Sequence, residues 1–235
     1  MRLLCLFAVC FSWLACKKES ADSIISSPVP FRPTPTSPHT WLALGDSYTI
    51  GQGVEARERF PAQAVDLLYK KNISVDTLTY LATTGWTTTD LLQAMDSRKP
   101  LPHKVVTLLI GVNDQYRRWD TGGYRTRFRE LLVRAVGLAR GNSKRVCVLS
   151  IPDYSVTPYA RNMDTTRIRK EIDQFNQINR DETQLLGAVY VEITALTREA
   201  RMFPALIAGD GLHPSGMDYR RWADKLLPFL EGAFQ

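Results

Sequence analysis

The protein has 235 residues, of which 44% are hydrophobic and 23% are charged, a balance typical of a globular protein with a substantial core. This composition excludes a disordered chain, a collagen-like repeat and a polytopic membrane protein. The formal net charge of +6 is compatible with an acidic partner but identifies none.

The chain opens with an apolar segment over residues 3–15 that contains a single serine and is preceded by an arginine. It is too short to span a bilayer, which takes about 20 residues, and it is typical of a signal peptide. The segment ends in Trp13-Leu14-Ala15-Cys16, which resembles a bacterial lipobox. That resemblance implies a lipoprotein signal peptide over residues 1–15 and lipidation of Cys16. Ordinary secretion is the alternative, because Trp13 stands where a lipobox usually has leucine.

Residues 16–39 follow as a tether with lysines, several serines and five prolines but almost no apolar periodicity. We therefore expect an extracytoplasmic protein held to a bacterial membrane by a lipid anchor. Lys17 directly after the cysteine resembles lipoproteins of the outer membrane, if the cell has one. Cys147 is the one cysteine after residue 16, which excludes a disulfide framework in the folded part and suggests a small core residue.

From residue 40 onward, short apolar or β-branched runs alternate with longer amphipathic segments. The pattern predicts strands over 40–44, 75–81, 104–110, 145–151 and 188–193, and helices over 58–71, 88–96, 121–140 and 164–186. Ser215 and Asp218 resemble a capping box, which predicts a last helix from about Gly216, kinked or ended at Pro228. Near-continuous apolar strands separated by helices indicate one α/β domain over residues 40–235, with a five-stranded parallel sheet covered on both faces.

Four polar blocks stand where a parallel sheet presents its ligand-binding edge. They are Gly45-Asp46-Ser47-Tyr48, Thr84-Gly85-Trp86 and Gly111-Val112-Asn113-Asp114 after the first three strands, and Asp210-Gly211-Leu212-His213-Pro214 near the C-terminus. Ser47 can attack a carbonyl carbon when a base takes its proton, and His213 can be that base. His39 lies in the tether and His103 precedes a strand at the opposite edge, so His213 is the one candidate among the three histidines. Asp210 is close enough in sequence to orient its imidazole.

The four blocks resemble the GDSL, or SGNH, hydrolase superfamily, whose signature residues are a serine, a glycine, an asparagine and a histidine in this order. The resemblance implies a three-layer α/β/α, flavodoxin-like fold and a triad of Ser47, Asp210 and His213. It also implies an oxyanion hole made by the backbone N–H groups of Ser47 and Gly85 and the side-chain amide of Asn113. Tyr48 replaces the leucine of the family's name, a position that carries no chemistry.

By the same resemblance, the protein is a serine esterase that cleaves carboxylic esters through an acyl-enzyme, with no metal or cofactor. The family's substrates include short acyl esters, O-acetylated polysaccharides, lysophospholipids and thioesters. Export favours acetylated glycans or lipids, because acyl-CoA is cytosolic. A non-catalytic surface module that binds glycan or peptidoglycan is the alternative, although a pure binder has no need of all three triad residues.

Other motifs favour structural roles. Residues 51–56 match a dinucleotide fingerprint, with Asp76 as its acidic residue, but the first strand's turn is already occupied by the serine block. Asp46 and Asp114 are expected to organise loops as hydrogen-bond acceptors. The scattered histidines offer no pair of metal ligands.

An arginine-rich stretch over residues 117–134 predicts a solvated helix face, with contact to an anionic polymer or to lipid headgroups as the alternative. We expect no nucleic-acid partner. Three aromatic residues follow the asparagine and glycine blocks: Tyr116, Trp119 and Trp86. They either line the pocket or pack in the core.

Overall fold

The computed structural model describes residues 38–118 and 120–235 of the chain. The predicted signal peptide, the lipidation of Cys16 and a wall position for Trp119 fall outside the described residues. His39, assigned to the tether from the sequence, is attached to the folded domain. Its backbone N–H donates to Asp76 Oδ2 at 2.7 Å, and its ring packs against Phe234.

A single five-stranded sheet forms the centre of the domain, with all strands parallel and in the order β2-β1-β3-β4-β5. The strands are β1 Thr40–Gly45, β2 Thr77–Ala82, β3 Val105–Leu109, β4 Val146–Leu149 and β5 Val189–Val191. The inner strands β1, β3 and β4 are buried almost throughout, since helices cover both faces, whereas the edge strands β2 and β5 are largely part-exposed. The predicted three-layer α/β/α class is confirmed.

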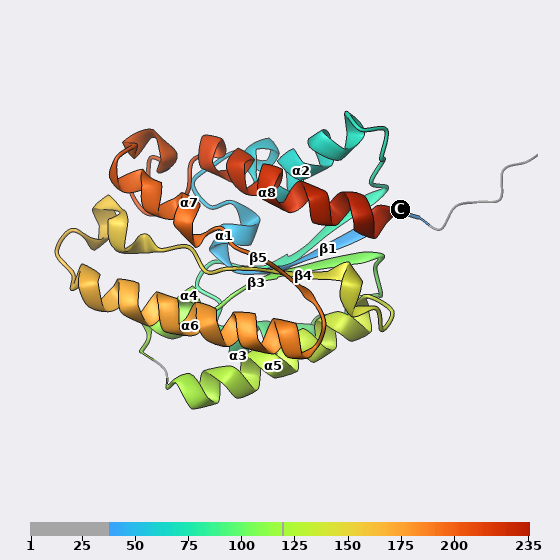
Figure 1. Ribbon diagram of the computed structural model, residues 1–235, viewed down its shortest axis with the longest axis horizontal. Coiled ribbons are helices and arrows are strands. Elements are labelled where there is room, and N and C mark those ends of the chain that lie inside the picture. Colours follow the sequence, from blue (N-terminus) through green and yellow to red (C-terminus); the bar gives the residue numbers. More distant parts are fainter. Residues whose placement is uncertain (1–37, 119) are drawn as a thin grey trace, which may run out of the picture. The chain divides into compact units, whose positions relative to one another are not determined.

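The longer helices flank the sheet in two layers, with α2 and α8 on one face and α3, α5 and α6 on the other (Figure 1). Their bounds are α2 Phe60–Tyr69, α3 Thr88–Arg98, α5 Thr121–Leu138, α6 Thr165–Leu185 and α8 Gly216–Phe234. Side chains cap several of them at their N-termini. Thr87 and Asp90 form a capping box on α3, and Asp164 accepts from the Arg167 N–H on α6.

Short helical elements, which the sequence did not predict, connect the layers. They are α1 Ser47–Ile50, α4 Val112–Tyr116 and α7 Thr194–Arg198, together with the 3₁₀ turns η1 Ala56–Glu58, η2 Ser143–Arg145, η3 Tyr154–Val156, η4 Pro158–Ala160, η5 Glu199–Arg201 and η6 Pro204–Leu206. Two of these helices, α1 and α4, follow β1 and β3 directly and begin at the carboxyl edge of the sheet, where the polar blocks lie (Figure 1).

The last helix begins at Gly216, as predicted, but differs in two details. The Ser215 hydroxyl accepts from the Asp218 N–H at 3.4 Å, while the Asp218 carboxylate binds Trp222 Nε1 and the Arg221 guanidinium, both at 3.1 Å. The Asp218 side chain therefore binds residues one turn further along α8 rather than the backbone N–H of Ser215. Pro228 lies inside the helix and does not end it, because the buried side chains around it hold the helix on the sheet.

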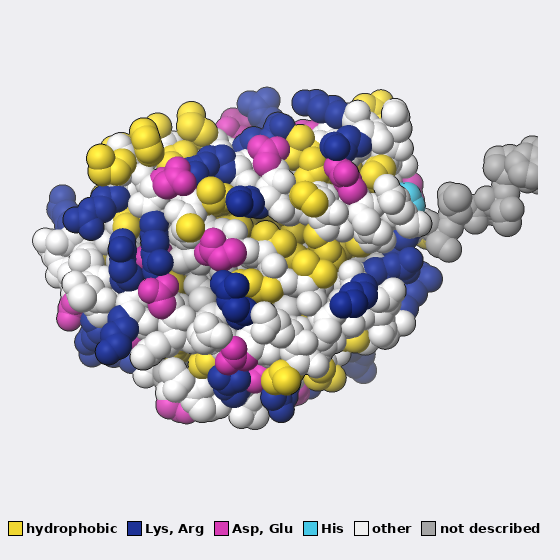
Figure 2. Space-filling model, in the orientation of Figure 1, with side chains coloured by type: hydrophobic (Ala, Val, Ile, Leu, Met, Phe, Trp, Pro, Cys, Tyr) yellow, Lys and Arg dark blue, Asp and Glu magenta, His cyan; other side chains and the backbone are white. Residues whose placement is uncertain are grey.

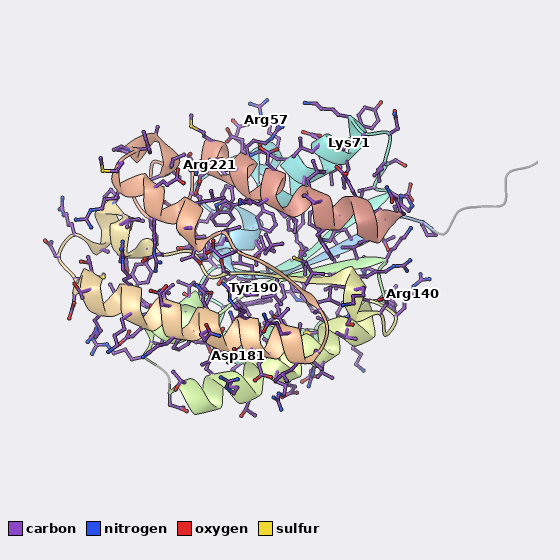
Figure 3. All side chains as sticks on the ribbon, in the orientation of Figure 1. Arg57, Lys71, Arg140, Asp181, Tyr190 and Arg221 are labelled. Atoms are coloured by element: carbon purple, nitrogen blue, oxygen red, sulfur yellow. The ribbon has the colours of Figure 1, made fainter. Side chains whose placement is uncertain are left out.

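The arginine-rich stretch forms most of α5 and is organised by ion pairs. Arg125 and Arg129 both bind the buried carboxylate of Glu182 on α6, at 2.7 Å and 2.5 Å, and Arg125 also reaches Asp181, which lies on α6 (Figure 3). The aromatic residues Tyr124 and Phe128 between the arginines are fully buried. In Figure 2, basic and acidic side chains are interspersed over the visible face. The stretch therefore forms a partly solvated helix face, on which Arg125 and Arg129 are paired with carboxylates of α6.

Candidate active site

Ser47 is placed by the end of β1. The strand ends at Gly45, and the chain turns at once into α1, of which Ser47 is the first residue. Asp46 stabilises the turn, because its Oδ1 accepts from the Tyr48 N–H at 3.0 Å at the N-terminus of α1. The buried Ser47 hydroxyl therefore stands at the carboxyl edge of the sheet, in the wall of a cavity.

His213 is hydrogen-bonded to Ser47 on one side and to Asp210 on the other. Its Nε2 is 3.0 Å from Ser47 Oγ, and its Nδ1 is 2.6 Å from Asp210 Oδ2. An ionised carboxylate can only accept, so Nδ1 carries the ring proton and Nε2 is left to accept from the serine. The structure thus joins Ser47, His213 and Asp210 in a continuous chain of hydrogen bonds.

The loop that carries His213 is held at both ends. Ile207 and Pro214 form an isolated antiparallel bridge, and the Ala208 N–H donates to the His213 carbonyl at 2.7 Å. Asp210 closes the loop from within, since its Oδ1 accepts from the backbone N–H groups of Leu212 and His213, each at 2.9 Å. These bonds orient the imidazole before any substrate arrives.

The hydrogen bonds of Asp210 also determine its charge. Burial acts to raise the pKa of Asp210, but the N–H groups of Leu212 and His213 and the His213 ring outweigh it and hold the pKa below the usual value of an aspartate. The carboxylate is therefore ionised at neutral pH. A fixed negative charge beside Nδ1 stabilises a positive charge on the imidazole.

Gly85 and Asn113 follow β2 and β3, the two strands that flank β1. Gly85 has a φ of +79°, a left-handed conformation that favours glycine, and its N–H donates to no residue that the structure describes. Gly111, with a φ of +125°, lets the chain turn from β3 into α4, which carries Asn113. The Asn113 amide donates one N–H to the Trp86 carbonyl at 2.9 Å, and the side chain lines the cavity beside Ser47. The second amide proton is left for another acceptor.

The cavity beside Ser47 has a volume of about 90 Å³. Its walls are Ser47, Tyr48, Val112, Asn113, Tyr116, Tyr154, Tyr159, Leu212 and His213. Tyr116 is therefore in the wall, whereas Trp86 packs against the Arg98 guanidinium. Tyr48 adds no reacting group but packs against the His213 ring, with ring centres 5.3 Å apart.

Tyr154 and Tyr159 were missed from the sequence. They belong to the segment after β4, and Tyr159 is bonded to the histidine loop through its N–H and the Gly211 carbonyl at 2.9 Å. The rule that identified the other blocks, inspection of the residues after each strand, applies to this segment too and could have indicated them.

Two buried aspartates support these loops, as expected from the sequence. Asp114 accepts from the Thr88 N–H at 2.9 Å and from the Thr88 hydroxyl, which joins α4 to the start of α3. Burial raises the pKa of Asp46 to about 8, with the nearby Asp114 adding to the effect. Asp46 is therefore mostly protonated and neutral at pH 7.

The glycines of the dinucleotide-like motif have other positions. Gly51 ends α1 in a left-handed conformation. Gly53 lies so close to Asp210 that a Cβ atom there would stand 3.0 Å from its carboxylate. Neither glycine opens a helix after β1, as a nucleotide-binding turn would require. The segment instead packs beside the Asp210 loop.

The remaining candidates are structural. Cys147 is buried within β4, and burial raises its thiol pKa far above the ordinary range, in keeping with a core residue. His103 lies before β3 and binds the Thr79 hydroxyl at 3.1 Å. Within residues 38–118 and 120–235, no three His, Cys, Asp or Glu side chains are grouped as metal ligands.

A family profile and several solved structures match the chain. The profile of the GDSL-like lipase/acylhydrolase family matches residues 43–221. No curated protein sequence matches the chain. Among solved structures, the acetylxylan esterase Axe2 from Geobacillus stearothermophilus superposes with a TM-score of 0.62 at 20% identity, covering 82% of this chain and 94% of its own.

Two further solved structures have the same TM-score. A lipase/acylhydrolase from Enterococcus faecalis has a TM-score of 0.62 at 18% identity, covering 83% of this chain and 96% of its own. A member of the lipolytic G-D-S-L family from Veillonella parvula has a TM-score of 0.62 at 16% identity, covering 80% and 96%. At these identities the likeness shows a common fold.

Proposed function

The chain belongs to the GDSL-like lipase/acylhydrolase family, and from this premise we propose that it is a serine esterase that hydrolyses carboxylic esters through an acyl-enzyme. The observation that carries the proposal is the hydrogen-bonded chain from Ser47 through His213 to Asp210. A module that only binds glycan needs no base behind a serine. The aligned base therefore favours the esterase over the binding module.

In the first half of the reaction, Ser47 Oγ attacks the ester carbonyl carbon while its proton passes to His213 Nε2. The imidazolium that forms is stabilised by the ionised Asp210. Collapse of the tetrahedral intermediate breaks the bond to the alcohol oxygen, which leaves with the proton from Nε2. Ser47 then holds the acyl group as an ester, and His213 is neutral again.

Water completes the cycle. Nε2 takes a proton from the water molecule as its oxygen attacks the acyl-enzyme, and the proton returns to Ser47 Oγ when the acid leaves. In both halves, negative charge develops on the former carbonyl oxygen. We assign its stabilisation to the N–H groups of Ser47 and Gly85 and to the amide proton of Asn113 that Trp86 does not use.

The size of the cavity indicates a short acyl group. Its volume of about 90 Å³ is small beside the roughly 300–1,000 Å³ of sites for drug-sized ligands. The enzyme should therefore cleave p-nitrophenyl acetate with a higher kcat/KM than the octanoate, measured on the full chain. A higher kcat/KM on the octanoate would contradict the short acyl group but not ester hydrolysis. If no ester in the series were turned over, the proposed function itself would be contradicted.

Asn113 tests the oxyanion hole. Asn113→Ala should lower kcat about 10²–10³-fold with little change in KM, because the amide contact strengthens as charge develops in the transition state. Steady-state kinetics on p-nitrophenyl acetate measure both constants. Asn142→Ala, at the opposite edge of the sheet, is the matched control and should leave both unchanged. An effect confined to KM would make Asn113 a substrate-binding residue instead.

We also propose that the enzyme is anchored outside the cytoplasm by a lipid on Cys16. None of the helices in the described part of the chain is long and apolar enough to cross a bilayer. The described domain starts beside β1 at the amino edge of the sheet, and Ser47 follows the carboxyl end of that strand. The described part of the chain thus begins at the edge of the sheet opposite to Ser47.

Replacing the lipidated cysteine tests the anchor. Cys16→Ser should move the enzyme from the membrane fraction to the soluble fraction with its esterase activity intact, because the several acyl chains of a lipoprotein are what hold it. Cys10→Ser, inside the apolar segment, is the matched control and should stay anchored. Retention of the Cys16→Ser protein after a high-salt wash would contradict the lipobox, and salt-sensitive retention would point to the arginine-rich stretch.

A further inference from the structure

Three tyrosines gather at the mouth of the active-site cavity. Tyr116 comes from α4, Tyr154 from η3 and Tyr159 from η4, and their ring centres are 6.3 to 6.5 Å apart. The hydroxyls of Tyr116 and Tyr159 are hydrogen-bonded at 2.9 Å. Tyr116 is 49% exposed and Tyr159 is 43% exposed, while Tyr154 is buried beneath them. The cluster is thus an aromatic surface that opens to solvent beside Ser47.

The tyrosine surface is held in place by backbone and ionic contacts. The Tyr159 N–H donates to Gly211, inside the loop that carries His213. The buried Asp153, next to Tyr154, caps η3 and binds Arg198 Nε at 2.7 Å. The rings therefore keep a set position relative to the nucleophile and its base, as a positioning surface requires.

A second, larger cavity adjoins the first and shares Tyr116 and Tyr154 with it. Its volume is about 550 Å³, within the usual range for a bound small molecule. The side chains that complete it are mostly polar: Gln115, Arg118, Asn162, Asp164 and Arg167, with Met163 and Ile168. The path from Ser47 over the tyrosines thus leads into a space rich in hydrogen-bonding groups.

We propose that the tyrosine surface and the second cavity bind the alcohol side of the ester, and that this alcohol is a glycan. The inference rests on the proposed esterase function. A sugar ring carrying the acyl group would stack on Tyr116 and Tyr159 with its ester carbonyl at Ser47, and the next sugar unit would occupy the second cavity. The sugar hydroxyl released on acylation takes its proton from His213.

The chemistry of the two cavities favours a glycan over a lipid. A tyrosine presents an apolar ring face and a hydroxyl, which match the C–H face and the hydroxyl edge of a sugar. Burial raises the pKa of Tyr154 to about 12, and the bond to Tyr116 raises that of Tyr159, so both hydroxyls can donate at neutral pH. The long acyl chain of a lysophospholipid would have to lie in the first cavity, whose volume of about 90 Å³ is small for such a chain.

Kinetics on two esters with the same acyl group test the tyrosine surface. Tyr116→Ala and Tyr159→Ala should lower kcat/KM on O-acetylated xylotetraose by about tenfold or more, equivalent to about 1.4 kcal/mol, mainly through KM. The loss on p-nitrophenyl acetate should be much smaller, since its alcohol is a single ring. Tyr159→Phe keeps the ring and should lose less than Tyr159→Ala. The matched control is Tyr69→Ala, which replaces a 75% exposed tyrosine on α2 and should leave kcat/KM unchanged on both substrates.

The length of the glycan tests the second cavity. Wild-type kcat/KM should rise from acetylated xylose to acetylated xylotetraose, and Arg167→Ala should reduce this gain. No gain with length would contradict a sugar in the second cavity. The glycan subsite would be contradicted if the tyrosine variants lost equal kcat/KM on both acetyl esters, or lost kcat/KM selectively on lysophosphatidylcholine vesicles. In either case, turnover of p-nitrophenyl acetate by the wild-type protein would still support the esterase function.

Discussion

Ser47→Ala should abolish ester hydrolysis, with a fall in kcat of about 10⁶-fold, the scale seen when a serine hydrolase loses its nucleophile. Without Oγ no acyl-enzyme can form, and His213 has no hydroxyl to deprotonate. The measurements are kcat on p-nitrophenyl acetate and covalent labelling by a fluorophosphonate, located by mass spectrometry. The wild-type protein should be labelled at Ser47 and the variant not at all.

The fold should survive this change, because only one buried hydroxyl, bonded to His213, is removed. A thermal melt therefore serves as a check on folding, and Ser97→Ala, on the surface of α3, is the matched control that should keep both activity and labelling. Labelling of the Ser47→Ala protein at another serine would overturn the assignment of the nucleophile. Glycan binding by a wild-type protein that hydrolyses no ester would favour the binding module.

His213→Ala and Asp210→Asn should differ in the size of their losses. Removal of the imidazole leaves Ser47 without a base, and kcat should fall about 10⁶-fold. An asparagine at position 210 can still accept from the Leu212 and His213 N–H groups through Oδ1, but its amide would donate to Nδ1. The ring proton would then sit on Nε2, the wrong nitrogen, and kcat should fall about 10⁴-fold.

The pH dependence of kcat gives a second test of the role of Asp210. Because the orienting carboxylate is missing in Asp210→Asn, its residual activity should rise toward alkaline pH, where hydroxide can deprotonate the serine without the imidazole. His103→Ala, a histidine at the amino end of β3, is the control and should keep wild-type kcat per folded molecule. Small, equal losses in the His213 and Asp210 variants would mean that another histidine serves as the base.

The order of the strands along the chain was predictable because each strand is marked by its own short run of apolar residues. The buried strands β1, β3 and β4 are continuous apolar runs, and each predicted strand is present in the structure with small shifts at its ends. Helix α8 was predictable at its start, since Ser215 caps it, but not along its length. A proline in its interior usually kinks or ends a helix. Packing against the sheet explains why α8 continues past Pro228.

The residues of the candidate site were predictable as a set, but their geometry was not. In a parallel sheet, residues after successive strands meet at one edge, so Ser47, Gly85 and Asn113 were expected together. The 3.0 Å contact between Ser47 and His213 joins residues far apart in the chain. It depends on the bridge between Ile207 and Pro214 and on the closure of the loop by Asp210, contacts that no local pattern encodes.

By itself, the sequence determined the strand and helix order, the α/β class, the family and the residue types at the strand ends, because these depend on periodicity and on local turn chemistry. The tertiary structure decided the short helices α1 and α4, which are too brief to show a helical period. It also decided that Glu182 pairs with arginines of α5, and that Tyr154 and Tyr159 join Tyr116 beside Ser47. Such contacts form between segments distant in sequence, and they exist only once the layers have packed.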